Sequence, residues 1–162
     1  PLLEPFKCEI TVIRKRPISL PGTVRTIQLE DLNVVLPTTD VLLIALALTD
    51  ETENLIGASE LKLLPKDAVI VNVARGKHIV TEDLVKALTD SEIAGAALDV
   101  TDPEPLPAGH PLWNLPNCLI TPHTANTPEM GIELLSLRVT ENVSRYLQGL
   151  DLIGCIDIDS GY

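Results

Sequence analysis

Short apolar runs alternate with helical patterns along this chain, and this alternation limits its fold more than any other feature. Helical patterns lie at residues 58–64 and 81–88, and Thr81 is expected to cap the second of these helices. Repeated strand–helix units form a parallel sheet with helices on its faces, so the sequence predicts an α/β fold with a doubly wound parallel sheet. Four apolar runs are its expected strands: residues 40–47, 68–73, 95–100 and 118–121. The first is apolar throughout, as a strand covered on both faces should be, and the second is expected to be buried.

The longest helix is expected to begin at Thr127-Pro128, because a capping residue followed by proline is typical of a helix start. Gly149 is expected to end it. Its apolar residues are three or four positions apart, which places them on one face of the helix. They are Ile132, Leu135, Val139, Val143 and Tyr146.

The charge balance argues against several classes of partner. Twelve basic and 23 acidic side chains among 162 residues give a formal net charge of -11, whereas a surface that binds nucleic acid needs a basic stripe. Aromatic residues are 2% of the chain, too few for stacking bases. The longest apolar stretch, residues 41–48, is shorter than the roughly twenty residues of a membrane span. We expect neither nucleic acid nor membrane as a partner.

Cysteine usage indicates neither a disulfide framework nor a metal site. Cys8, Cys118 and Cys155 are odd in number, widely spaced and free of any C-x-x-C pairing. A reduced, cytoplasmic setting is the simplest account of this pattern.

Three titratable residues follow the ends of expected strands. Arg75, Glu104 and His123 come just after the strands at 68–73, 95–100 and 118–121. The carboxyl ends of parallel strands open on one edge of a sheet, where ligands bind. We therefore expect these three side chains to lie at a common edge.

This trio suits the reduction of a 2-keto acid. A guanidinium can hold a carboxylate in a fork, and a histidine can exchange a proton with the neighbouring carbonyl oxygen. A glutamate beside the imidazole fixes its tautomer. Each residue also has a plainer interpretation, as a surface ion pair, a loop residue or a structural histidine, and spacing alone leaves these open. His78 and His110 lie in loop-like contexts and are expected to be structural or exposed.

At these residues the sequence resembles the D-isomer-specific 2-hydroxyacid dehydrogenase family. The motifs follow in the family's order and at its spacing over about residues 5–150. They are Leu46-Ala47-Leu48-Thr49 with Glu51-Thr52, Val71-Asn72-Val73-Ala74-Arg75-Gly76, Gly95-Ala96-Ala97-Leu98-Asp99-Val100, Pro103-Glu104-Pro105-Leu106 and Asn117-Cys118-Leu119-Ile120-Thr121-Pro122-His123.

The resemblance implies a Rossmann-type NAD(P)-binding domain in residues 1–127, and a crossover helix and tail returning to a substrate domain in residues 128–162. It implies that Arg75 binds and polarises the keto acid, that His123 is the acid–base, and that Glu104 is its partner. Asp99 would meet the nicotinamide carboxamide. Further cofactor contacts would be Val73, Ala74 and Ala125 near the nicotinamide ribose, Leu46, Ala47 and Thr52 on the adenosine side, and Arg75, His123 and Asn126. Ala47 stands where the family often has proline, and Asn126 where glycine is common.

The expected strand at residues 10–13 bears on the choice of cofactor. In dinucleotide-binding folds an acidic residue at the end of the second strand bonds the ribose 2′-hydroxyl, whereas arginine accommodates a 2′-phosphate. Here the strand is followed by Arg14, Lys15 and Arg16. We predict NADP as the preferred cofactor, with NAD as the alternative. The plainer interpretation is that these three cations only keep the end of the strand solvated.

No G-x-G-x-x-G phosphate loop occurs in the chain. In the doubly wound order the strand preceding that loop is central, so the strands at 10–13 and near 41 should have unpaired edges toward each other. We expect these 162 residues to be a carboxy-terminal portion of a longer enzyme, inactive alone.

The sequence thus predicts an oxidoreductase that moves hydride between NAD(P)H and a small 2-keto acid, giving a D-2-hydroxy acid. Glyoxylate, hydroxypyruvate and pyruvate are candidate substrates, and the resemblance implies a homodimer. One alternative is a nucleotide-sensing, corepressor-like protein without turnover. Another is a structural fragment serving in assembly.

Overall fold

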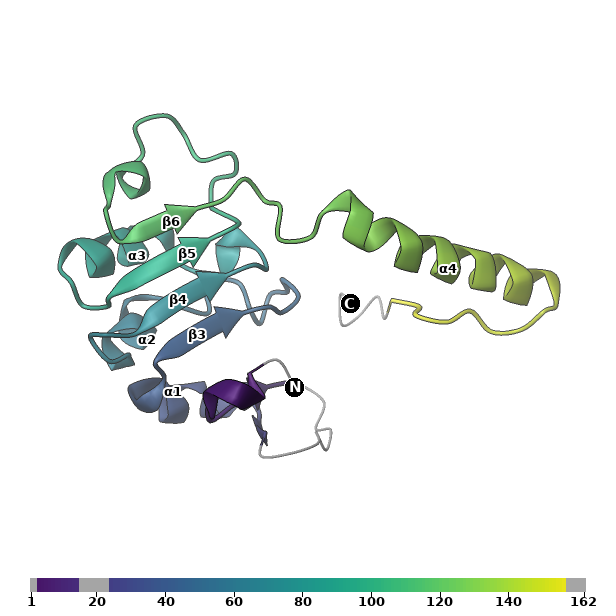
Figure 1. Ribbon diagram of the computed structural model, residues 1–162, viewed down its shortest axis with the longest axis horizontal. Helices are drawn as coiled ribbons and strands as arrows, with labels where there is room; N and C mark the ends of the chain where they lie inside the picture. Colours follow the sequence, from purple (N-terminus) through teal and green to yellow (C-terminus); the bar gives the residue numbers. More distant parts are fainter. Residues whose placement is uncertain (1–2, 15–23, 157–162) are drawn as a thin grey trace.

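Four parallel strands form the main sheet, in the order β3-β4-β5-β6 (Figure 1). The computed structural model describes residues 3–14 and 24–156. The strands are β1 (Thr11–Ile13), β2 (Arg25–Ile27), β3 (Val41–Ile44), β4 (Val69–Asn72), β5 (Gly95–Leu98) and β6 (Cys118–Ile120). The α-helices are α1 (Leu32–Val35), α2 (Ala58–Leu63), α3 (Thr81–Thr89) and α4 (Pro128–Leu147). Short 3-10 helices lie at Glu4–Phe6, Leu29–Asp31, Leu36–Thr38, Gly76–His78 and Pro111–Asn114.

The four expected strands of the main sheet are confirmed, and each ends earlier than its apolar run. The largest difference is at β3, which stops at Ile44 while the run continues to residue 47. The ladder is in register along its length, so Val41 pairs with Val69 and Val69 with Gly95. All four strands therefore have their carboxyl ends at one edge of the sheet.

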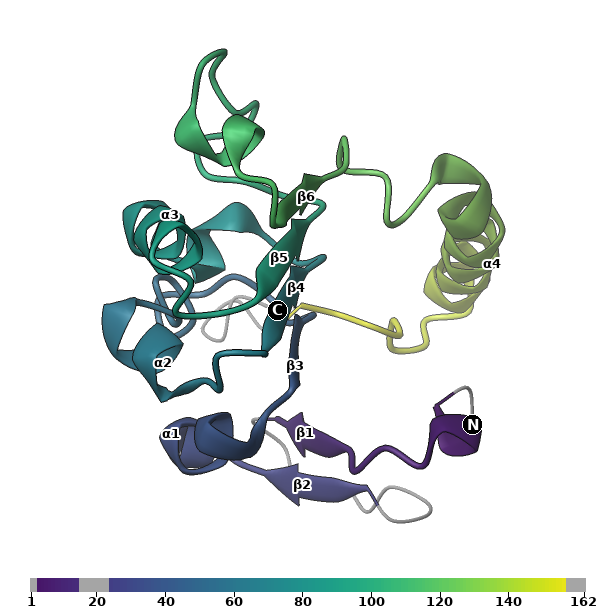
Figure 2. The same cartoon turned by 60° about the vertical axis from the view of Figure 1, so that its left-hand side comes forward.

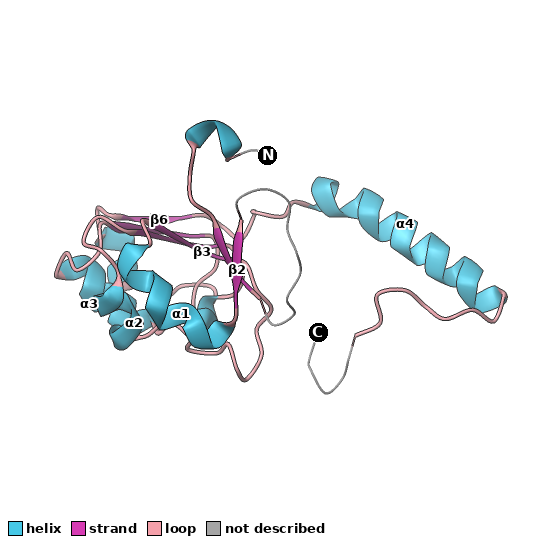
Figure 3. Cartoon of the chain, turned by 90° about the horizontal axis from the view of Figure 1, so that it is seen from below, coloured by secondary structure: helices cyan, strands magenta, loops and turns pink. Residues whose placement is uncertain are grey.

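Helices α1, α2 and α3 lie on one face of the main sheet (Figure 3). The apolar core lies between this face and the helices, because alternate strand residues point toward it. Ile70 is fully buried, and Ile44 is 3% exposed. Leu36, Ile56, Leu61, Ile70, Ile93 and Leu112 are among the largest fully buried side chains.

The opposite face of the sheet is open in the described part of the chain. Val41, Leu43 and Leu119 point to this face and are 61%, 60% and 63% exposed. The prediction that residues 40–47 form a strand covered on both faces is therefore wrong for this chain. An unbroken apolar run shows what a strand can bury, and only the arrangement of other elements decides what covers it.

Strands β1 and β2 form a separate two-stranded parallel sheet (Figure 2). β2 was not expected from the sequence, because Ile27 is its one apolar residue and the segment forms no apolar run. The doubly wound order places one strand between β1 and β3. No described residue supplies that strand, and β1 and β3 are not joined in one sheet. The predicted partial, doubly wound fold is confirmed.

Helix α4 begins at Pro128 after Thr127, as expected, and Gly149 beyond its end has a φ of 70°. It stands away from the sheet on the side of the open face (Figure 2). The five residues of its predicted apolar face are 52–76% exposed. The segment after α4 runs back along the helix and is held there by Asn142. The side chain of Asn142 accepts a hydrogen bond of 2.9 Å from the Ile153 backbone nitrogen and donates one of 3.0 Å to the Ile153 carbonyl.

The prediction that Thr81 caps helix α3 is wrong. Val80 is the capping residue, and Thr81 is the first residue of the helix. Its hydroxyl instead donates a hydrogen bond of 2.7 Å to the backbone carbonyl of Asp102. This acceptor lies 21 residues along the chain, so local sequence patterns could not reveal it.

Candidate active site

The loops that follow β4, β5 and β6 carry Arg75, Glu104 and His123 at the carboxyl edge of the main sheet (Figure 1). This placement follows from the parallel ladder and agrees with the expectation from sequence. The structure brings Glu104 and His123 into contact. Arg75 makes no ion pair with either of them, although all three lie among the described residues.

Glu104 and His123 form a short hydrogen bond. The Nδ1 atom of His123 lies 2.6 Å from Oε1 of Glu104, and the two side chains are 48% and 40% exposed. A carboxylate accepts a hydrogen bond at this distance, so it orients the ring with Nδ1–H toward the glutamate. The other ring nitrogen, Nε2, is then the one available to a substrate.

His123 has a φ of 56°, in the left-handed region that few non-glycine residues adopt. Such a conformation persists only where the surroundings hold it. Here the backbone around His123 is held by the side chain of Asp99, which is 7% exposed. Its Oδ1 accepts hydrogen bonds from the Thr121 hydroxyl at 2.5 Å and the Thr124 amide at 2.9 Å, and its Oδ2 accepts one from the Ala125 amide at 2.8 Å.

These bonds change the acidity of Asp99. Burial by itself raises the pKa of the carboxyl, but the hydrogen bonds from Thr121, Ala125 and Thr124, with the nearby His123, bring the pKa below its usual value. The carboxylate form therefore holds the loop on both sides of His123. Sequence reasoning assigned Asp99 to the cofactor alone and missed this anchoring role.

Arg75 is placed by a turn built around Asn72, which is 1% exposed. The side-chain amide of Asn72 donates to the Arg75 carbonyl at 2.9 Å and accepts from the Ala74 amide at 3.0 Å. The Arg75 guanidinium donates to the Ala74 carbonyl at 2.6 Å and is otherwise exposed. Asn72 was not singled out from the sequence. A buried asparagine at the end of an apolar strand is the signal that could have found it.

An open groove of about 310 Å³ lies over the ends of β4, β5 and β6. Its size is at the lower end of the range for small-molecule sites, and its walls are mostly apolar, as the face of a nicotinamide ring requires. The residues present therefore fit the nicotinamide end of a dinucleotide. The lining residues are Val71, Val73, Ala97, Leu98, Asp99, Leu119, Thr121, Thr124 and Ala125.

Only some of the expected cofactor residues line this groove. Val73, Asp99 and Ala125 do. Ala74 is 7% exposed and does not line it, because the turn at Asn72 points its backbone inward. Asn126 is exposed but does not line the groove.

The expected adenosine-side residues form a turn of their own after β3. The Thr52 hydroxyl donates to the Ala47 carbonyl at 2.8 Å and accepts from the Thr49 amide at 2.8 Å. His78 is fully buried, with one ring nitrogen 2.9 Å from the Thr52 carbonyl and the other 3.2 Å from the Leu46 carbonyl. His78 is therefore a structural residue that holds this turn against the loop after β4.

Arg14 follows β1 and is half-buried, and its backbone nitrogen donates to the Ile27 carbonyl at 3.1 Å. The other two cations of the expected 2′-phosphate site, Lys15 and Arg16, lie outside the described residues.

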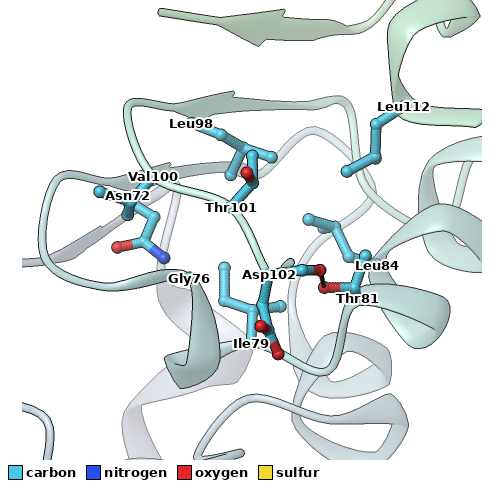
Figure 4. A pocket seen from close by; sticks show the side chains of 10 residues that line it. All are labelled: Asn72, Gly76, Ile79, Thr81, Leu84, Leu98, Val100, Thr101, Asp102 and Leu112. Atoms are coloured by element: carbon cyan, nitrogen blue, oxygen red, sulfur yellow. Dashed lines mark hydrogen bonds between the residues drawn. The ribbon is translucent and has the colours of Figure 1, made fainter. Parts of the chain in front are cut away.

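A second, much smaller void of about 10 Å³ lies beneath the loops after β4 and β5 (Figure 4). Gly76, Thr81, Leu84, Val100 and Asp102 are among its lining residues. A void of this size is at the lower limit for a single water molecule, so it is a gap in packing rather than a ligand site.

The described residues contain no group of three or more His, Cys, Asp or Glu side chains arranged to hold a metal ion. Among the same residues, no helix has the length and apolar character needed to cross a membrane.

Comparison with known proteins identifies the class to which this fold and site belong. Residues 1–125 match the family model described as D-isomer specific 2-hydroxyacid dehydrogenase, NAD binding domain. This chain belongs to that family.

Several relatives agree with this assignment. The chain is 43% identical to a glyoxylate reductase of Aeropyrum pernix over 84% of its own length and 40% of that protein's. Among solved structures, an NADPH-dependent glyoxylate/hydroxypyruvate reductase from Sinorhizobium meliloti, in complex with NADP and sulfate, has a TM-score of 0.89 at 27% identity, over 99% of this chain and 52% of that one. The NAD-complexed D-isomer specific 2-hydroxyacid dehydrogenase from Lactobacillus delbrueckii ssp. bulgaricus has a TM-score of 0.82 at 26% identity, over 96% and 50%. The chain thus spans about half the length, or less, of these relatives.

Proposed function

We propose that the complete protein is a reductase that transfers a hydride from NADPH to a small 2-keto acid and produces a D-2-hydroxy acid. The observation that carries this proposal is the Glu104–His123 pair, 2.6 Å apart, at the carboxyl edge of a sheet whose groove fits a nicotinamide. Glyoxylate and hydroxypyruvate are the proposed substrates, because similar proteins carry those names. Pyruvate is the third candidate.

The three strand-end residues have separate roles in this reaction. Arg75 holds the substrate carboxylate with its exposed guanidinium and polarises the adjacent carbonyl. His123 gives the proton on Nε2 to the carbonyl oxygen, and Glu104 stabilises the imidazolium before that transfer. The nicotinamide, when bound, supplies the hydride to the carbonyl carbon. One hydride and one proton convert the keto acid to the hydroxy acid, so the step balances.

NADP is the proposed cofactor, and NAD is the alternative. Support comes from Arg14 at the carboxyl end of β1, where a cation suits a 2′-phosphate, and from the NADP found in the Sinorhizobium meliloti reductase. Val73, Asp99 and Ala125 are proposed to contact the nicotinamide end, with Ala74, Arg75, His123 and Asn126 beside it. Leu46, Ala47 and Thr52 are proposed to lie on the adenosine side.

The proposal extends to the organisation of the complete protein. Residues 1–127 would form the dinucleotide-binding domain and residues 128–162 a crossover helix and tail, since α4 starts at Pro128 and stands apart from the sheet. A homodimer follows from the family resemblance. A cytoplasmic location is supported by the unpaired state of Cys8, Cys118 and Cys155.

The test is a comparison of NADPH and NADH oxidation with glyoxylate, hydroxypyruvate and pyruvate, using the complete polypeptide. We expect that the nucleotide is oxidised only when a keto acid is present, and that NADPH is oxidised faster than NADH. His123→Gln should lower kcat by about 10²–10⁴-fold, the usual contribution of a general acid–base, and leave nucleotide binding intact. Nucleotide binding without oxidation by any keto acid would contradict the proposal and indicate a sensor.

A further inference from the structure

Thr81 joins helix α3 to the loop that carries Glu104. Its hydroxyl donates a hydrogen bond of 2.7 Å to the backbone carbonyl of Asp102, two residues before Glu104 (Figure 4). The hydroxyl has no capping role that would explain it, because Val80 is the capping residue of the helix. This contact links the segment after β4 directly to the segment after β5.

The backbone before Glu104 is also supported by Gly76. A Cβ atom added to Gly76 would lie 2.0 Å from the Thr101 carbonyl oxygen and 2.5 Å from the Asp102 nitrogen, so the two backbones are in direct contact. Within the loop, the Thr101 hydroxyl donates to the Pro103 carbonyl at 3.0 Å. Residues 101–103 are therefore held by Gly76 at one point and by Thr81 at another.

The carboxylate of Glu104 depends on this support. The side chain is 40% exposed, so burial does not fix its direction. Its partner His123 is fixed independently, through the hydrogen bonds that the Thr124 and Ala125 amides donate to Asp99. The 2.6 Å contact between the pair thus requires that the backbone of Glu104 stay where residues 101–103 hold it.

We propose that Thr81 is a positioning residue for the Glu104–His123 pair, which it serves by holding the Asp102 carbonyl. This inference rests on the proposed function, in which the pair carries out acid–base chemistry. Thr81 does not touch the substrate or the cofactor. Its loss leaves the acid–base groups present but poorly aligned, so it affects the rate of the chemical step and leaves nucleotide binding unchanged.

The test uses variants of the complete protein. Thr81→Val keeps the shape of the side chain and removes its hydroxyl, and Thr81→Ser restores the hydroxyl. Thr89→Val is the matched control, because Thr89 lies on the same helix and its hydroxyl donates a bond of the same length, 2.7 Å, to the Val85 carbonyl. Thr81→Val should lower kcat about 10-fold without changing the KM for the nucleotide, whereas Thr81→Ser and Thr89→Val should retain the parent rate.

A double-mutant cycle separates positioning from general stability. In a Glu104→Gln background, Thr81→Val should cause no further loss of kcat, because the group it positions has already lost its charge. An equal loss in both backgrounds, or no loss in the parent, would overturn the proposal. Thermal unfolding of each variant shows that the comparison is made between folded proteins.

The two proposals can fail separately. If the parent protein oxidises neither nucleotide with any keto acid, the proposed function fails. The role of Thr81 is then decided by crystal structures of the parent, Thr81→Val and Thr89→Val. A Glu104–His123 hydrogen bond lost only in Thr81→Val supports positioning, and one retained in all three overturns it.

Discussion

Arg14 and Arg25 are two cations at opposite ends of the small β1–β2 sheet. Arg14 follows the carboxyl end of β1, whereas Arg25 begins β2 and pairs with Thr11. Only the first lies at the edge where a dinucleotide binds. At the scale of the residue, we predict that Arg14→Leu lowers the ratio of kcat/KM for NADPH to that for NADH by about 10- to 150-fold, because a charged hydrogen bond contributes about 1.5–3 kcal/mol.

Arg25→Leu is the control for this change, since it removes the same charge at the other end of the sheet. It should leave the ratio unchanged. The measurement is steady-state kinetics with each nucleotide at a saturating keto acid concentration. Equal effects of the two substitutions would mean that the strand-end cation does not read the 2′-phosphate.

At the scale of the element, the loops after β4 and β5 meet at Gly76. Its Cα lies so close to the next loop that an added Cβ would be 2.0 Å from the Thr101 carbonyl oxygen. We predict that Gly76→Ala pushes the two loops apart, lowers the free energy of unfolding by about 1–3 kcal/mol, and reduces kcat. Urea unfolding and steady-state kinetics on the complete protein measure both effects.

Gly57→Ala is the matched control for Gly76→Ala. Gly57 is the capping residue of α2, as Gly76 is the first residue of a 3-10 helix, but a Cβ at Gly57 would meet no atom closer than 3.4 Å, which is ordinary contact. Its effect on stability should be small and its effect on kcat absent. If the two substitutions gave the same loss, the close approach at Gly76 would have no role in the site.

At the scale of the whole molecule, two apolar surfaces of the described chain are exposed. One is the open face of the main sheet, and the other is α4, where Leu134 and Leu135 are 70% and 64% exposed. Large exposed apolar patches on a protein surface favour association with other apolar surfaces. We predict that the 162-residue chain produced alone binds the dye ANS and associates at micromolar concentration.

The contribution of α4 can be measured separately. A shortened chain that ends at residue 126 lacks the helix and should bind less dye, while retaining the signal from the open sheet face. Sedimentation velocity should show less association of the shortened chain than of the 162-residue chain. ANS fluorescence no greater for the 162-residue chain than for the complete protein would contradict the prediction.

Much of the fold could be predicted from the sequence because its signals are local. Apolar runs of strand length fixed the four strands of the main sheet, and Thr127, Pro128 and Gly149 set the ends of the longest helix. β2 was missed because only one of its three residues, Ile27, is apolar. The role of Thr81 was misread because its hydroxyl found an acceptor 21 residues away rather than in its own first turn.

The sequence by itself determined that Arg75, Glu104 and His123 share one edge, because parallel strands all end on the same side of a sheet. The family resemblance named Glu104 as the partner of His123, but the spacing of the residues alone did not show which of the three side chains touch. Only the tertiary structure decided that Glu104 and His123 lie 2.6 Å apart while Arg75 turns to the Ala74 carbonyl. It also assigned Asp99 to the loop around His123 and Asn72 to the turn before Arg75. The physical reason is that the positions of strands along the chain depend on short-range patterns, whereas hydrogen bonds between loops depend on how distant segments pack.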